Sequence, residues 1–138
     1  LREGGWSPVV IYAREDAEMG RRIALEQTGA TVVPLPAEAS TGGIEPLAVA
    51  RDLARRGVLG TLVEGGGRTL GRFVAAGLVD KWYWYAAPRL MGDPRSRAAV
   101  DAGAATLEQA WSGRIAGVRV LGDDMLITLY PYSTQPGA

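Results

Sequence analysis

Short apolar runs alternate with segments of helical periodicity over most of the chain. Runs rich in β-branched and aromatic residues predict strands at residues 9–13, 31–35, 58–63 and 81–90. Apolar residues at helical spacing predict helices that begin near Asp16, Pro46 and Arg68 and end at Gly29, Gly57 and Gly77. This alternation is typical of an α/β fold in which a mostly parallel sheet is flanked by helices.

The last third of the chain has a different pattern. Two apolar runs, residues 114–121 and 125–132, flank Gly122-Asp123-Asp124, and this turn chemistry predicts an antiparallel hairpin. No internal repeat or long linker interrupts the sequence, so we expect one domain over residues 1–138. We expect residues 133–138 to form a frayed tail.

The composition excludes several classes of chemistry. The 138 residues include neither His nor Cys, so a zinc finger, a cysteine nucleophile or a Ser-His-Asp triad cannot form. A carboxylate metal site or a cofactor-driven reaction stays open, and we assign no metal ligands. The 15 basic residues balance 15 acidic ones, which argues against a nucleic-acid partner. The apolar runs fall far short of the ~18 residues of a membrane span. No basic-then-apolar signal follows Leu1, so we expect a cytoplasmic protein with no membrane partner.

A glycine loop, Glu64-Gly65-Gly66-Gly67, joins a predicted strand to a predicted helix. We expect its glycines to allow positive φ and to let a ligand approach without meeting a Cβ. The N–H groups and dipole of the helix start form an anion site suited to a pyrophosphate, to which Arg68 adds charge and Thr69 a hydroxyl. The loop matches neither a Walker motif nor a complete dinucleotide fingerprint. The alternative is a tight strand-to-helix turn whose glycines serve close packing.

Two charged residues extend this hypothesis. Glu64 is expected at the carboxyl end of a central strand, where α/β sheets bind ligands, and its carboxylate can orient a polar substrate. Alternatively, it is a solvated acid or a cap on its own loop. Arg14 follows the first strand, and its guanidinium matches the oxygens of a 2′-phosphate. Alternatively, it is an exposed side chain paired with Glu15 or Glu18.

The run Trp82-Tyr83-Trp84-Tyr85 places Trp on one face of a strand and Tyr on the other. We expect one face to pack in the core. The other face is large and aromatic, and such surfaces usually mark partner sites. We therefore expect a homodimer contact along residues 81–88. Two alternatives are a stacked aromatic ligand and further N-terminal strands that cover this face within one subunit.

Three segments together carry a family resemblance. They are Leu62-Val63-Glu64-Gly65-Gly66-Gly67, Gly77-Leu78-Val79-Asp80 and Ala87-Pro88-Arg89-Leu90-Met91-Gly92. In this order the chain resembles, over residues 8–132, the C-terminal reductase domain of the bifunctional riboflavin-biosynthesis deaminase/reductase family. The resemblance implies a three-layer fold similar to dihydrofolate reductase, in a reductase-type domain that lacks its N-terminal strands. It implies NADPH-dependent reduction of 5-amino-6-(5-phosphoribosylamino)uracil to the ribitylamino form.

The resemblance also assigns roles to residues of this chain. Glu64 would orient the substrate beside the nicotinamide, while Ala13 and Arg14 would contact the adenosine 2′-phosphate. The residues implied to hold the NADPH pyrophosphate are Gly65, Gly66, Gly67 and, through their N–H groups, Arg68, Thr69 and Leu70. Two alternatives stay open: a dihydrofolate- or pteridine-type reductase, and a noncatalytic NADPH-binding or dimerisation module. The choice between NADPH and NADH also stays open.

Overall fold

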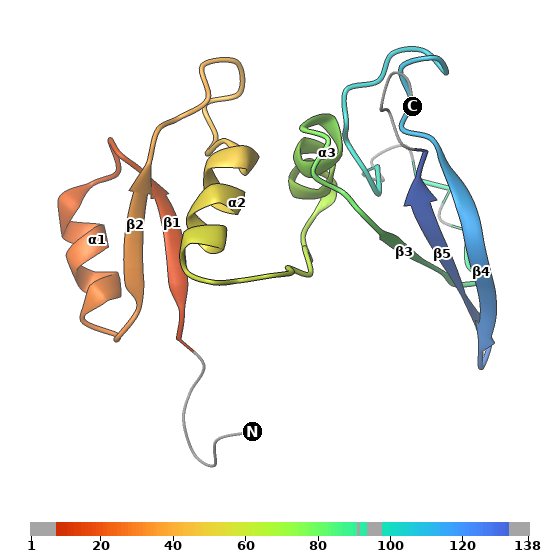
Figure 1. Ribbon diagram of the computed structural model, residues 1–138, viewed down its shortest axis with the longest axis horizontal. Coiled ribbons are helices and arrows are strands. Elements are labelled where there is room, and N and C mark those ends of the chain that lie inside the picture. Colours follow the sequence, from red (N-terminus) through yellow and green to blue (C-terminus); the bar gives the residue numbers. More distant parts are fainter. Residues whose placement is uncertain (1–7, 91, 94–97, 133–138) are drawn as a thin grey trace. The chain divides into compact units, whose positions relative to one another are not determined.

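A computed structural model describes residues 8–90, 92–93 and 98–132 of the chain. The chain divides into two compact units, one up to Thr61 and one from Leu62 (Figure 1). The tail expected at residues 133–138 lies outside the described residues, as does Met91 of the third resemblance segment.

The first unit contains a parallel pair of strands. β1 (Val10–Arg14) pairs with β2 (Thr31–Leu35) from Val10–Thr31 to Arg14–Leu35. The helix α1 (Met19–Glu26) makes the connection between them and lies beside β2 (Figure 1). Val32 and Leu35 of β2 and Pro46 are buried in this unit, so its core lies mainly on β2. Both strands form where the sequence predicts them.

The helix α2 (Pro46–Arg55) also agrees with its prediction. Pro46 occupies the first turn, where its missing N–H costs no hydrogen bond. Gly57 ends the helix with a φ of 81°, and the Val58 N–H donates to the Leu53 carbonyl at 3.0 Å, which is a Schellman arrangement. The Tyr12 hydroxyl donates to Asp52 Oδ2 at 3.1 Å and thereby ties β1 to α2. Burial, together with this hydrogen bond, raises the pKa of Tyr12.

The second unit combines one helix with an antiparallel sheet. The helix α3 spans Gly67–Ala75, and the strands are β3 (Trp82–Ala86), β4 (Gly113–Leu121) and β5 (Asp124–Pro131). The strand order is β3-β5-β4, with both neighbouring pairs antiparallel. The hairpin between β4 and β5 is confirmed, and its turn uses Gly122 at a φ of 66°.

The segment of residues 98–101, which has little sequence pattern, packs directly on α3. A Cβ at Gly67 would lie 2.3 Å from the Ala98 carbonyl oxygen, and one at Gly71 would lie 1.8 Å from that of Asp101. The Asp101 N–H donates to the Gly67 carbonyl at 2.9 Å. Glycine is therefore required at both helical positions, because any side chain would collide with backbone.

The strand predicted at residues 58–63 is wrong, because this segment forms no strand. A strand needs a partner for its N–H and C=O groups, and among the described residues β1 and β2 pair only with each other. Leu59 and Leu62, which the prediction placed inside a sheet, are exposed. The parallel sheet of the described structure is thus two-stranded rather than extensive. The aromatic strand is also shorter than predicted, since pairing stops at Ala86, shortly before Pro88.

No helix among the described residues is long and apolar enough to cross a membrane.

The packing of residues 98–101 on α3 predicts opposite effects of the same substitution in two helices. Gly20→Ala in α1 meets only ordinary contacts and should stabilise the protein by up to ~1 kcal/mol through helix propensity. Gly71→Ala gains the same propensity but must displace the Asp101 carbonyl. Overpacking of this kind costs roughly 1–3 kcal/mol, so we expect Gly71→Ala to lower the free energy of unfolding. Urea unfolding of both variants measures these changes. Stabilisation of the protein by both substitutions would contradict the close packing of residues 98–101 on α3.

Candidate functional site

The glycine loop enters α3 through extended backbone. Gly66 is the residue before the helix, with a φ of −71° and a ψ of 166°. None of Gly65, Gly66 and Gly67 has a positive φ, so the expectation of left-handed conformations here is wrong. The reason is that an extended residue before a helix already turns the chain into it, without a left-handed step.

The three glycines serve different purposes. A Cβ at Gly65 would lie 2.9 Å from the Thr69 Cβ, and one at Gly67 would meet the Ala98 carbonyl. These two positions therefore fit the close-packing alternative. A Cβ at Gly66 would meet no described atom within 4 Å. Gly66 is thus the position at which the absence of a side chain leaves backbone open to a ligand.

The first turn of α3 carries N–H groups that the helix does not use. The N–H groups of the first helical residues have no partner within a helix, and no side chain in the described part of the chain caps this one. The Leu70 N–H, in contrast, donates to the Gly66 carbonyl at 3.2 Å. The N–H groups left for a ligand are therefore those of Gly67, Arg68 and Thr69, and the last two residues are exposed. This arrangement can bind an anion.

Glu64 is exposed and lies directly before the three glycines. Because residues 58–63 form no strand, the expectation that Glu64 ends a central strand is wrong. Its carboxylate is an acceptor only and shares the accessible loop with Gly66. The two groups can therefore act on neighbouring parts of one ligand.

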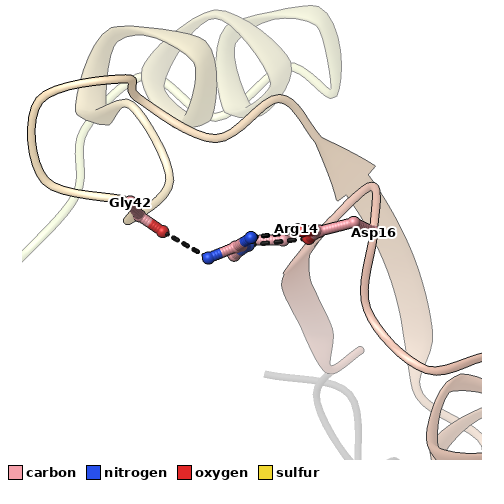
Figure 2. A network of polar contacts seen from close by, with 3 residues as sticks. All are labelled: Arg14, Asp16 and Gly42. Carbon is pink, nitrogen blue, oxygen red and sulfur yellow. Dashed lines mark hydrogen bonds and ion pairs between the residues drawn. The ribbon is translucent and has the colours of Figure 1, made fainter.

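Arg14 lies at the end of β1, beside Ala13, and its guanidinium is engaged on two sides (Figure 2). Its Nε donates to Asp16 Oδ1 at 2.7 Å, and its Nη2 forms an ion pair with Asp16 Oδ2. Its Nη1 donates to the Gly42 carbonyl at 2.9 Å. The hydrogen bond from Arg14 holds the pKa of Asp16 below its usual value, and the same bond raises the pKa of Arg14.

This pair corrects two expectations. Arg14 pairs with Asp16, not with Glu15 or Glu18, and Glu18 instead forms an ion pair with Arg21 at 3.2 Å. The helix expected to begin near Asp16 begins at Met19 instead, after Glu18. The sequence signal for this pair was the two-residue spacing of Arg14 and Asp16 directly after a strand, and the expectation of a helix start at Asp16 missed it.

The predicted site residues fall into two groups. Ala13 and Arg14 belong to the first unit, whereas Glu64 through Leu70 belong to the second. Each group is a local arrangement with its own accessible polar atoms.

A separate cavity of about 450 Å³ lies in the second unit. Three tryptophans dominate its wall: Trp82 is 6.3 Å from both Trp84 and Trp111, measured between ring centroids. Val74 of α3 and Leu129 of β5 also line it. The Trp face of β3 therefore lines the cavity together with α3, but it is not packed in a core as expected, because Trp84 is still 42% exposed. None of the predicted site residues lines this cavity.

The opposite face of β3 carries tyrosines and cations. Tyr83 and Tyr85 are 45% and 65% exposed. The Lys81 ammonium lies 4.8 Å from the centroid of the Tyr83 ring and 5.4 Å from that of Tyr130. This face is accessible and mixes aromatic surface with positive charge.

Comparison with known proteins gives a consistent result. The sequence model of one family, the RibD C-terminal domain, matches residues 2–127. The riboflavin biosynthesis protein RibD of Aquifex aeolicus (strain VF5) is 26% identical over 126 residues, which cover 91% of this chain and 33% of that protein.

Two structures of Acinetobacter baumannii RibD are also similar. Form 2 has a TM-score of 0.63 at 26% identity and form 1 a TM-score of 0.60 at 25% identity. The matches cover 89% and 90% of this chain and 37% of each RibD chain. The chain thus spans roughly a third of the length of these relatives.

The open position at Gly66 predicts the effect of a side chain there. Gly66→Val should leave the fold formed, with a loss of about 1 kcal/mol because valine is a poor residue before a helix. The same side chain should block access to the N–H groups of α3 and lower the affinity for a pyrophosphate ligand by at least about tenfold. Calorimetric titration with NADPH measures this. Gly60→Val is the control, since its Cβ also meets open space, and equal affinity of both variants would contradict the assignment.

Proposed function

Because the chain belongs to the family of RibD C-terminal domains, we propose that it is the NADPH-dependent reductase domain of riboflavin biosynthesis. Its substrate is 5-amino-6-(5-phosphoribosylamino)uracil, which is reduced to the ribitylamino form. The observation that carries the proposal is the accessible first turn of α3, with Gly66 open beside it and Glu64 directly before. The relatives are the riboflavin biosynthesis protein RibD of Aquifex aeolicus and RibD of Acinetobacter baumannii, and the name of the first supports the pathway.

The residues at the start of α3 fit the pyrophosphate of NADPH. A nine-residue helix carries about half a positive charge at its N-terminus, and its unused N–H groups point away from the helix. Gly67, Arg68 and Thr69 would donate these N–H groups to phosphate oxygens, and Gly66 would allow the close approach. The exposed Arg68 guanidinium adds a positive charge that NADPH, as a polyanion, requires. Arg14, with Ala13, is proposed to contact the 2′-phosphate.

Bound NADPH would supply the hydride, so the side chains need only bind and orient the reactants. Glu64 accepts hydrogen bonds from hydroxyl or amino groups of the substrate and so fixes its orientation. Positioning of this kind is the main contribution that a protein makes when two ligands react directly. His is absent from the sequence, and water is the proposed proton donor.

We propose that residues 1–138 form one layered domain similar to dihydrofolate reductase and that it works in the cytoplasm. The parallel pair β1–β2, with α1 beside β2 and α2 bonded to β1 through Tyr12 and Asp52, supports this layering (Figure 1). The family match over residues 2–127, which runs through both units, supports a single domain.

The role of Glu64 is tested by Glu64→Gln, which keeps the shape and removes the charge. A hydrogen bond to a charged group contributes about 1.5–3 kcal/mol, so kcat/KM should fall roughly 10- to 100-fold. The affinity for NADPH should stay within about threefold, because Glu64 contacts the substrate side. Steady-state rates with the pyrimidine substrate and NADPH titration give the two values, and Glu26→Gln on α1 is the control.

Two results would contradict this account of Glu64. Equal losses of NADPH affinity and of kcat/KM would mean that Glu64 shapes the loop. Reduction of dihydrofolate in preference to the pyrimidine would assign the chain to the other reductase class.

The exposed tyrosine face of β3 is the proposed homodimer contact. Tyr83 and Tyr85 do not line the tryptophan cavity, and tyrosine is enriched in the centres of protein interfaces. The dimer most common among soluble proteins is two-fold symmetric, so the same face of both subunits would meet.

Sedimentation equilibrium tests this contact. Tyr83→Glu should weaken the dimer by at least about 30-fold in Kd, because central aromatic residues contribute 2 kcal/mol or more. Leu107→Glu introduces the same charge at an exposed apolar residue outside the sheet and should leave the dimer intact. A monomeric protein, or a dimer unaffected by Tyr83→Glu, would rule out this surface.

A further inference from the structure

The ion pair at the end of β1 decides what kind of ribose the Arg14 guanidinium can accept. Asp16 occupies the edge of the guanidinium formed by Nε and Nη2, and Gly42 holds Nη1 from the other side (Figure 2). The pair is accessible, since the Arg14 and Asp16 side chains are 44% and 64% exposed. A ligand that reaches Arg14 therefore meets both charges.

A phosphate group competes directly with Asp16. Guanidinium binds carboxylate and phosphate in the same bidentate geometry, so a 2′-phosphate must either displace Asp16 or bind beside its negative charge. Gly42 fixes the guanidinium through its carbonyl, which limits how far Arg14 can turn away from Asp16. Both routes weaken the binding of a phosphorylated ribose.

A free 2′-hydroxyl meets no such competition. It is neutral, and it can donate a hydrogen bond to the Asp16 carboxylate while that carboxylate stays paired with Arg14. A carboxylate near the end of a strand performs this function in dinucleotide-binding folds that accept NADH.

We infer that Asp16 determines specificity, and that it lowers the preference of this protein for a 2′-phosphate over a 2′-hydroxyl. The inference rests on the proposed function, in which Arg14 receives the adenosine end of the cofactor. The protein should therefore discriminate less between NADPH and NADH than Arg14 alone would allow.

The test uses two ligands that differ only in the phosphate of interest, 2′,5′-ADP and 5′-AMP. Their affinities are measured by calorimetry at low ionic strength, where exposed charges are least screened, and the Kd ratio reports the preference for the 2′-phosphate. Asp16→Asn keeps an acceptor for Arg14 and removes the charge. It should raise the preference for 2′,5′-ADP roughly three- to tenfold.

Two further variants separate this inference from the proposed function. Glu15→Gln removes the same charge one residue away, at an exposed position, and should change the ratio less than about twofold. Arg14→Gln should abolish the preference for 2′,5′-ADP altogether. Urea unfolding of each variant shows that the fold is retained, and Asp16→Ser repeats the test with a smaller side chain.

Each outcome decides one statement. A raised preference in Asp16→Asn, with none in Glu15→Gln, supports the inference. The inference is overturned if the Kd ratio of the two ligands is the same in Asp16→Asn, Glu15→Gln and the unchanged protein. In that case, a loss of the preference for 2′,5′-ADP in Arg14→Gln still supports the proposed role of Arg14. A preference that survives Arg14→Gln overturns that role and the inference with it.

Discussion

The contact between α3 and residues 98–101 is the constraint on which the candidate site depends. Backbone carbonyls of Ala98 and Asp101 lie against Gly67 and Gly71, and the Asp101 N–H is bonded to the Gly67 carbonyl. Such backbone-to-backbone packing is possible only where two glycines face the segment. It fixes the first two turns of the helix and, with them, the N–H groups that open toward a ligand.

This constraint separates two uses of glycine within one loop. Gly67 belongs to the packing of the protein, and Gly65 leaves room for Thr69. Gly66 alone of the three faces open space, so ligand access and structural packing use different positions. In the first unit, the Arg14 guanidinium has a structural function, because it joins the end of β1 to the loop at Gly42. The exposed guanidinium is thereby also part of the local structure.

Local sequence signals predicted the local structure well. β1, β2, α2 and the β4–β5 hairpin form where apolar periodicity, Pro46, Gly57 and Gly122 place them, because each signal acts within a few residues. The prediction of a strand at residues 58–63 was wrong because a strand needs a partner strand, and the pattern of one segment carries no information about its partner. The glycine triplet correctly marked a special turn. Its division into packing and accessible positions depends on residues 98–101, about thirty positions along the chain, and no local pattern reveals them.

The central claim is that the backbone at the start of α3 binds the pyrophosphate of a dinucleotide. Backbone amide NMR of the ¹⁵N-labelled protein during titration with NADPH tests this most directly, because it observes the N–H groups themselves. The account predicts saturable shifts for the amides of Gly66, Gly67, Arg68 and Thr69, which inorganic pyrophosphate reproduces and adenosine does not. Saturable NADPH binding that leaves these four amides unchanged would contradict it.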